Sequence, residues 1–367
     1  MLQKALVVVL VLASVASFMS CGGTSSHFVY AAIPDANQIA VFREDPYSGI
    51  LTQLSGSPYT VGDGVRAVVL HPSGKFLYAA NPGQNENDVS LFSIAGNGSL
   101  NEVFPRTPVG TLPTLLAMDP AGGYLYVGNA LSNTISVFSI DSGNGGLTPV
   151  AGSPFSIGLS PSSMQLSPSG NYLYVSAPSS TGVIAAFSVT AGVLSSSPIS
   201  LTPTADNNPT AMAIDPTGTY LYAANGGTAN SISIYTIGSS GALTQVPGSP
   251  LADASHLPVA LITDPTGQFL YVANQGGSVS GSGSGPTGPN IGTYSITAST
   301  GFPAAIQDSP FTTEAEPVSL ALDPNGKYLY VGNQSGGVQA FGNSGGSLNS
   351  IATYPLGNGI TSIAILQ

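Results

Sequence analysis

One motif recurs at an almost constant interval, and this repeat limits the fold more than any other feature. Its first complete copies are His71-Pro-Ser-Gly-Lys-Phe-Leu-Tyr-Ala-Ala-Asn81 and Asp119-Pro-Ala-Gly-Gly-Tyr-Leu-Tyr-Val-Gly-Asn129. Later copies begin at Ser167, Asp215, Asp264 and Asp323, so that successive starts lie 48, 48, 48, 49 and 59 residues apart. A seventh copy lacks the turn, since Phe28-Val-Tyr30 stands 48 residues before Phe76-Leu-Tyr78. A period of this length is typical of stacked or radially arranged units.

Each unit reads as four short strands. In the fifth copy, an apolar strand at 209–214 leads into the Asp-Pro-Thr-Gly turn, in which Pro presets φ and Gly takes the left-handed conformation. The next strand, 220–224, is apolar on both faces and is expected to be buried on both. An alternating strand at 232–237 and a short strand at 243–246 follow, joined by a Gly/Ser hairpin. Beyond the N-terminal apolar run, no stretch has helical periodicity.

These units predict an all-β, seven-bladed β-propeller with four-stranded blades. The first copy lacks its innermost strand, whereas the chain ends on an unpartnered strand at 360–365, so pairing the two closes the ring and leaves no open sheet edge. The predicted blade boundaries are 27–60 with 359–367 for blade 1, then 64–110, 112–159, 161–206, 208–256, 258–314 and 317–357.

The Asp-Pro-x-Gly-x-[Tyr/Phe]-Leu-Tyr-Val-x-Asn unit resembles the lactonase-like seven-bladed propellers, which include 6-phosphogluconolactonase and a fungal carboxy-muconate cyclase. It is also similar to the YVTN-repeat propellers of surface proteins. The resemblance covers residues 27–367 and implies this fold, with lactone hydrolysis as one activity. It identifies no catalytic residues, because no motif here matches the family's His, Glu and Arg positions, and fold alone does not specify function.

Composition excludes several classes. Six Lys+Arg against 17 Asp+Glu give a net charge of −11, too few cations for the basic surface that nucleic acid requires. A single cysteine excludes a disulfide scaffold and thiolate metal sites. We expect no cofactor and no metal. In particular, no Asp-x-[Asp/Asn]-x-[Asp/Asn]-Gly spacing supports a calcium site. Glu314 and Glu316, with Asp206 or Asp253, are therefore interpreted as solvated acids rather than as a cation site.

The N-terminus is predicted to direct export. Lys4 precedes an apolar run at 5–16 that is too short for a stable membrane span and is typical of a signal peptide. Ser20 and Cys21 match a lipoprotein cleavage site, which predicts a signal at 1–21, a lipidated Cys21 and a tether at 22–26. Ordinary cleavage nearby is the alternative. The membrane, through this lipid anchor, is then one partner of an envelope protein.

The sparse charges gather on one rim of the predicted propeller. The loops from the fourth strand to the next blade, and those between the second and third strands, share this rim, here called the long-loop rim. They carry Asp63, Arg66, Glu86, Asp88, Asp206, Asp253, His256, Glu314 and Glu316. Arg66 stands where other blades have Thr114, Ser162, Thr210, Val259, Val318 or Thr361, which makes it a candidate anchor for a carboxylate or a polarised carbonyl. Pairing with Asp63 is the alternative.

Other candidates carry simpler alternatives. His256 has a pKa suited to a general base, although a loop histidine is more often a surface residue. The asparagines that end the second strands are expected to cap loops, with ligand binding as the alternative; they are Asn81, Asn129, Asn225, Asn274 and Asn333. The turn aspartates are assigned to structure, because Asp accepts the N–H groups of such turns. The Gly/Ser-rich insertion at 275–290 reads as a flexible linker.

Two functions remain open. The favoured one is a non-catalytic, lipid-anchored propeller that binds a small molecule, glycan or protein through neutral hydrogen-bonding loops. The alternative is a hydrolase of an extracytoplasmic lactone, with Arg66 polarising the carbonyl and His256 or Glu316 activating water. In both cases Asp63, Asp206 and the five asparagines are candidate ligand contacts.

Overall fold

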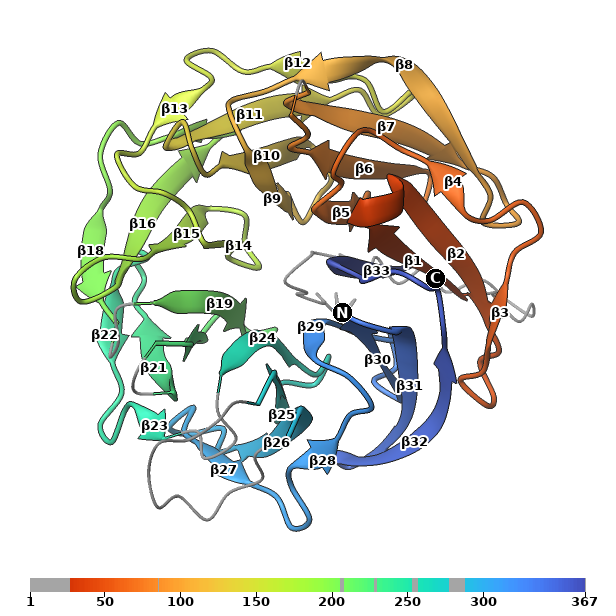
Figure 1. Ribbon diagram of the computed structural model, residues 1–367. Helices are drawn as coiled ribbons and strands as arrows, with labels where there is room; N and C mark the ends of the chain where they lie inside the picture. Colours follow the sequence, from red (N-terminus) through yellow and green to blue (C-terminus); the bar gives the residue numbers. More distant parts are fainter. Residues whose placement is uncertain are drawn as a thin grey trace, which may run out of the picture.

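The computed structural model describes residues 27–84, 86–204, 208–227, 230–252, 257–276 and 288–366. It contains seven antiparallel sheets arranged radially, as predicted (Figure 1). The 3₁₀ turn η1 (Pro34–Ala36) is the only helical element in these ranges. None of the described helical structure has the length and apolar composition needed to cross a membrane. The predicted signal peptide, Cys21 and the tether lie outside the described residues.

The strands of each blade are named A to D from the axis outward. The first three blades are built from these strands: β33 (Ser362–Leu366), β1 (His27–Ile33), β2 (Gln38–Glu44), β3 (Leu51–Gln53) and β4 (Tyr59–Thr60) in blade 1; β5 (Ala67–Leu70), β6 (Phe76–Asn81), β7 (Asp88–Ile94) and β8 (Leu100–Pro108) in blade 2; β9 (Pro113–Met118), β10 (Tyr124–Asn129), β11 (Thr134–Ile140), β12 (Leu147–Pro149) and β13 (Phe155–Ser156) in blade 3.

The remaining blades follow the same order: β14 (Ser163–Leu166), β15 (Tyr172–Ala177), β16 (Val183–Thr190), β17 (Val193–Leu194) and β18 (Ser200–Pro203) in blade 4; β19 (Pro209–Ile214), β20 (Tyr220–Asn225), β21 (Ser231–Ile237), β22 (Leu243–Gln245) and β23 (Leu251–Ala252) in blade 5; β24 (Pro258–Thr263), β25 (Phe269–Asn274), β26 (Asn290–Ile296), β27 (Pro303–Ala305) and β28 (Phe311–Thr312) in blade 6; β29 (Pro317–Leu322), β30 (Tyr328–Asn333), β31 (Gly337–Ser344) and β32 (Ser347–Tyr354) in blade 7.

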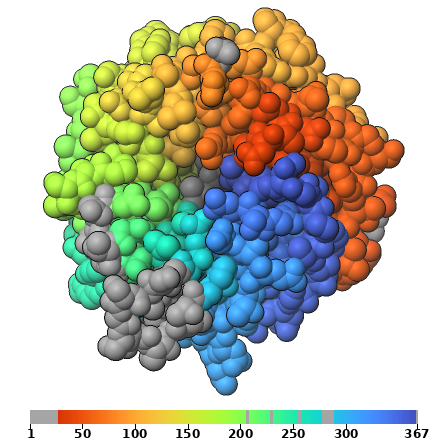
Figure 2. All heavy atoms as spheres, in the orientation of Figure 1, coloured from red at the N-terminus to blue at the C-terminus, as the bar shows by residue number. Residues whose placement is uncertain are grey.

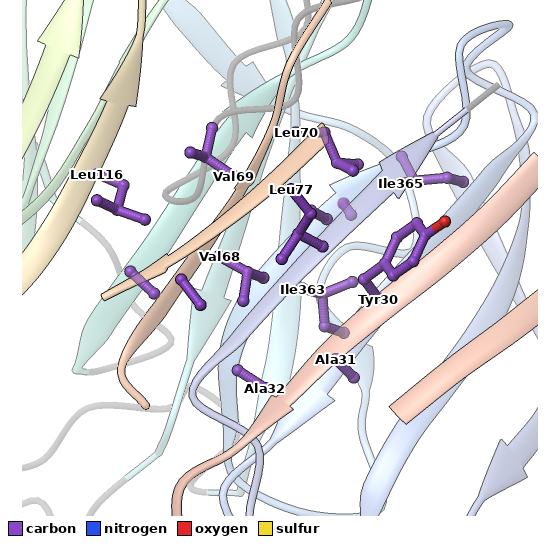
Figure 3. Close-up of a cluster of buried hydrophobic side chains, with 14 of the residues drawn as sticks. Tyr30, Ala31, Ala32, Val68, Val69, Leu70, Leu77, Leu116, Ile363 and Ile365 are labelled. Carbon is purple, nitrogen blue, oxygen red and sulfur yellow. The ribbon is translucent and has the colours of Figure 1, made fainter. Parts of the chain in front are cut away.

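The ring closes as the sequence predicts. The C-terminal β33 pairs antiparallel with β1, placing Ile365 opposite Val29 and Ile363 opposite Ala31. Figure 3 shows Ile363 and Ile365 among the buried side chains between β1 and β5. The A strands β33, β5, β9, β14, β19, β24 and β29 each contact the A strand of the next blade, which completes the inner ring. In Figure 2 the blue C-terminal segment lies directly against the red N-terminal one.

The aromatic pair of the repeat joins neighbouring blades. The second tyrosine is fully buried in all seven copies, and in five its hydroxyl donates to the carbonyl oxygen of a glycine in the next blade's C–D hairpin, as Tyr222 does to Gly301 at 2.8 Å. The first aromatic ring covers the same glycine, so that a Cβ at Gly301 would lie 2.2 Å from the Tyr220 ring. Glycine is therefore required at this hairpin position by both space and positive φ.

The outermost strand, D, extends further along the chain than the sequence predicts. In five blades strand D is interrupted, and a second short strand follows that pairs with the same strand C. At four of these breaks the serine of a Ser-Pro pair replaces a backbone acceptor, as where the Val137 N–H donates to Ser153 Oγ at 2.9 Å. A serine hydroxyl thus satisfies the C strand where the outer ladder breaks. The segment after strand D, for which the sequence predicts no strand, therefore belongs in part to the sheet.

The turn residues have the structural role expected of them. Asp215 Oδ1 accepts the Thr219 and Tyr220 N–H groups at 2.7 and 2.6 Å, and Asp264 and Asp323 bind the equivalent N–H of Phe269 and Tyr328. His71 replaces the aspartate in blade 2. Its Nδ1 accepts the Ser73 N–H, and its Nε2 lies 2.9 Å from the Gly122 carbonyl oxygen of blade 3, while burial lowers its pKa.

Candidate functional site

Arg66 lies at the start of an A strand, at the long-loop rim. In blades 3, 5, 6 and 7 the equivalent residue is the extra residue of a β-bulge between strands A and B, as the register shift around Thr210 shows. Bulges redirect side chains and are frequent beside active sites. The half-buried hydroxyls at this position reach the next blade: Ser162 donates to the Pro209 carbonyl oxygen at 2.6 Å and Thr210 to that of Pro258 at 2.7 Å.

Arg66 does not take part in this inter-blade contact. Its backbone N–H binds the Ala80 carbonyl oxygen, and its side chain is exposed. Within the described residues, its guanidinium has no hydrogen bond or ion pair, so the expected alternative of a pair with Asp63 is wrong. Asp63 Oδ1 instead accepts from Asn37 Nδ2 at 3.0 Å. With respect to the described residues, Arg66 therefore presents an unpaired cation at the mouth of the ring.

Several charged side chains at the long-loop side of blade 2 are linked by hydrogen bonds and are here called the blade 2 network. Glu86 Oε2 accepts the Asp63 N–H at 3.0 Å and Arg106 Nη1 at 2.9 Å. Arg106 Nε donates to Glu102 Oε1 at 2.7 Å, and this bond raises the Arg106 pKa. Asp88 accepts from Asn81 Nδ2 at 2.7 Å, while its burial raises its pKa. Both carboxylates beside Arg106 neutralise it, so this arginine offers little to a ligand.

Sequence reasoning missed Asn37, Glu102 and Arg106. The two charged residues lie on β8, and only the charges in loops were assigned to the rim. Their four-residue spacing on an extended strand puts both side chains on one face, a signal that was available in a chain with 6% charged residues. Asn37 follows η1, and its Oδ1 also accepts the Gly64 N–H at 2.8 Å, which fixes the loop that carries Asp63.

Glu314 and Glu316 are exposed in the loop between blades 6 and 7, on the same rim. Glu316 uses its backbone carbonyl oxygen to accept the Gln334 N–H at 2.8 Å, while the Glu314 N–H donates to Gln339 Oε1. No contact among the described residues joins either carboxylate to Arg66. His256, Asp206 and Asp253 lie outside the described residues, so their roles stay predictions.

The five asparagines at the ends of the B strands share one environment. All are at most 1% exposed. Asn129 Nδ2 donates to the hydroxyls of Thr134 and Ser136, and Asn225 Nδ2 to those of Ser231 and Ser233. Their amide oxygens have no partner among the described residues; these are Oδ1 of Asn81, Asn129, Asn225, Asn274 and Asn333. The amides of Asn81, Asn129, Asn225 and Asn274 thus fasten strand B to strand C. Ligand binding by the five oxygens stays a prediction.

Comparison with known proteins supports the same fold. A protein of Bacteroides fragilis provisionally assigned as a 6-phosphogluconolactonase is 17% identical, with a TM-score of 0.77 and coverage of 94% of this chain and 98% of that one. The periplasmic gluconolactonase of Pseudomonas aeruginosa is 16% identical, with a TM-score of 0.74 and coverage of 93% and 99%. These likenesses concern the fold alone. No curated protein sequence matches the chain.

A family model settles the classification. The model described as "Lactonase, 7-bladed beta-propeller" matches residues 55–158, 152–256 and 250–348, which together span most of the repeats. The matched region includes Arg66, the blade 2 network and the Tyr-Leu-Tyr strands. With its seven closed blades, this chain belongs to the seven-bladed β-propeller lactonase family.

Proposed function

We propose that this propeller binds a neutral, hydroxyl-rich ligand, such as a sugar or sugar lactone, at the long-loop rim with Arg66 as its anchor. The proposal depends on one observation: the guanidinium of Arg66 is exposed and forms no ion pair with any described carboxylate. A guanidinium donates parallel N–H groups to a ring carbonyl or to adjacent hydroxyls. The hydroxyls of Ser162, Thr210 and Thr361 at the equivalent positions donate to carbonyl oxygens of the next blade, and their oxygen atoms remain neutral acceptors around the same mouth.

The electrostatics favour a neutral ligand over a phosphorylated one. A phosphate needs several unpaired cations, whereas the second arginine of this region, Arg106, is neutralised by Glu86 and Glu102. The other charges on the rim are acidic, namely Asp35, Asp63, Asp88, Glu314 and Glu316. Their summed field repels anions. A free sugar or a neutral lactone avoids this repulsion.

Lactone hydrolysis is the second candidate, and membership of the lactonase family favours it. The periplasmic gluconolactonase of Pseudomonas aeruginosa has the same fold and, by its name, acts outside the cytoplasm. In this chain Arg66 would polarise the lactone carbonyl, with His256 or Glu316 as the base that activates water. Its support is weaker than that for binding, because no described base contacts Arg66.

Replacing Arg66 tests both candidates. We expect R66A to weaken binding of D-glucono-1,5-lactone or a free sugar by roughly 10- to 100-fold, the loss of one or two charge-assisted hydrogen bonds. R43A is the control, because Arg43 is also exposed but lies near the C–D hairpins of the opposite rim. Isothermal titration gives the affinity, and a pH-stat assay with neutral and 6-phosphorylated gluconolactone gives turnover above the spontaneous rate.

The outcomes separate the candidates. Binding without turnover supports the binding function, and turnover that falls in R66A and in either H256A or E316Q supports hydrolysis. A preference for the phosphorylated lactone, or equal effects of R66A and R43A, would refute the proposed anchor.

We also propose that the chain is exported and anchored through Cys21. The apolar run at 5–16 followed by Ser20 and Cys21 supports this, as does the extracytoplasmic place named for one structural neighbour. We expect C21S to abolish radiolabelled palmitate incorporation and to move the protein from the membrane fraction to the soluble one. S20A, which keeps a small residue before the cysteine, should change neither. Palmitate incorporation that persists in C21S would contradict the assignment.

A further inference from the structure

A buried cluster of three metal-ligating side chains lies where the ring closes. His27, Glu44 and Asp323 are 5%, 2% and 1% exposed, and one donor atom from each lies within 4.8 Å of the other two. His27 begins β1 and Glu44 ends β2 in blade 1, whereas Asp323 belongs to the A–B turn of blade 7. The cluster is remote from Arg66, at the rim that carries the A–B turns.

Only Asp323 is explained by the repeat. It accepts the Tyr328 N–H at 2.7 Å, the role that the other turn aspartates also have. The position of Glu44 is aliphatic in blades 2 to 6, where Ile94, Ile140, Val189, Ile237 and Ile296 occupy it. Blade 1 therefore buries a carboxylate at a place where its counterparts have half-buried aliphatic side chains. The neighbouring His27 begins β1, where the A–B turn would lead into strand B in the other blades.

The charges of the cluster do not balance. His27 Nδ1 lies 3.0 Å from Glu44 Oε2, so a protonated imidazole would compensate one carboxylate at most. No lysine or arginine among the described residues forms an ion pair with Glu44 or Asp323. Two buried carboxylates with one cationic partner leave an uncompensated negative charge, which is costly away from water.

One oxygen of the cluster also lacks a partner. Glu44 Oε1 is buried and accepts no hydrogen bond from any described group. Burial, and after it the nearby Glu44 carboxylate, raises the pKa of Tyr330, whose hydroxyl donates to the Gly49 carbonyl oxygen at 3.1 Å. A buried carboxylate oxygen without a donor is unusual, and a cation satisfies it directly.

We propose that His27, Glu44 and Asp323 bind one divalent transition-metal ion of the Zn²⁺ type and thereby fasten the first strand of the ring to its last blade. An imidazole nitrogen with carboxylate oxygens is a donor set suited to Zn²⁺, at about 2.0–2.2 Å per bond, rather than to Ca²⁺ or Mg²⁺, which prefer oxygen alone. Glu44 supplies Oε1 as a fourth donor. Donor atoms of different residues around one tetrahedral ion lie about 3.4 Å apart. The separations in the cluster, which are at most 4.8 Å, therefore shorten by up to about 1.4 Å when the ion binds.

The test is metal binding by the purified, untagged full chain after dialysis against a chelator and then against Zn²⁺. We expect one equivalent of zinc by elemental analysis. We also expect the Tm to rise by roughly 3–5 °C when free Zn²⁺ is 100-fold above its Kd. E44Q and D323N should each lower the bound zinc to below about 0.2 equivalents and remove the rise in Tm. Asparagine still accepts the Tyr328 N–H, which keeps D323N foldable.

D264N is the matched control, because Asp264 holds the same turn in blade 6 without a histidine or glutamate in contact. It should bind zinc like the parent chain. Co²⁺ provides a second readout, with visible absorption bands of a histidine–carboxylate site that E44Q and D323N lose. The proposal would be overturned if the parent chain bound much less than one equivalent of zinc, or if D264N lost as much bound zinc as E44Q and D323N. The three side chains would then form a buried hydrogen-bonded cluster without a metal ion.

Discussion

A chain that ends at Asn358 is expected to lose its cooperative fold. The deletion removes β33, whose Ile363, Ala364 and Ile365 are at most 1% exposed. Each buried isoleucine removed costs about 2–5 kcal/mol, and β1 loses a complete ladder of backbone partners. Because domains of this kind are stable by about 5–15 kcal/mol, the loss consumes most or all of that margin.

The measurement is thermal and urea unfolding followed by circular dichroism and dye binding. We expect a broad transition or none, with dye bound at 25 °C. The variant T361V is the control, because it removes only the Thr361 hydroxyl contact to the Val65 carbonyl oxygen at 3.3 Å. A peptide of residues 359–367 added in trans should restore the sharp transition. A truncated chain that unfolds at the parent Tm would show that closure contributes little.

The architecture could be predicted because its cause is local and repeated. Each copy carries its own turn and two-sided strand, and the missing strand of the first copy is found at the end of the chain, so that count and closure both follow. The resumed outer strands could not be predicted in the same way. Two-residue strands such as β23 (Leu251–Ala252) have too few residues to show a hydrophobic period.

The candidate site was predictable only where position in the repeat defined it. Arg66 is identified by comparison with its six counterparts, and the structure leaves it exposed and unpaired among the described residues. Contacts that depend on how loops and blades come together in space carry no such signal. Arg106 meets Glu86 because a loop folds back over β8, and His27 meets Asp323 across 296 positions of sequence only after the ring has closed. Such pairs depend on three-dimensional register, which a single sequence does not encode visibly.

The hairpin glycines offer the sharpest single-residue test of how blades join. We expect G98A to destabilise the protein by about 2–4 kcal/mol. Gly98 has a φ of +85°, where an L-residue costs about 1–2 kcal/mol, and an added Cβ would lie 2.3 Å from Cδ1 of Phe28 in blade 1. Any shift that relieves this overlap also disturbs the 3.1 Å hydrogen bond from the Tyr30 hydroxyl to the Gly98 carbonyl oxygen.

G96A is the matched control in the same hairpin, since a Cβ at Gly96 meets no atom within 4 Å and its φ is not positive. Urea denaturation should show an unchanged or slightly raised stability for G96A. The double variant F28A/G98A isolates the contact between blades. If overlap with the Phe28 ring causes most of the loss, G98A should cost at least about 1 kcal/mol less in the F28A background. If G98A lowered the free energy of unfolding equally in the two backgrounds, the loss would be due to backbone strain. The Phe28 ring would then contribute packing but would not be the reason that glycine is required at position 98.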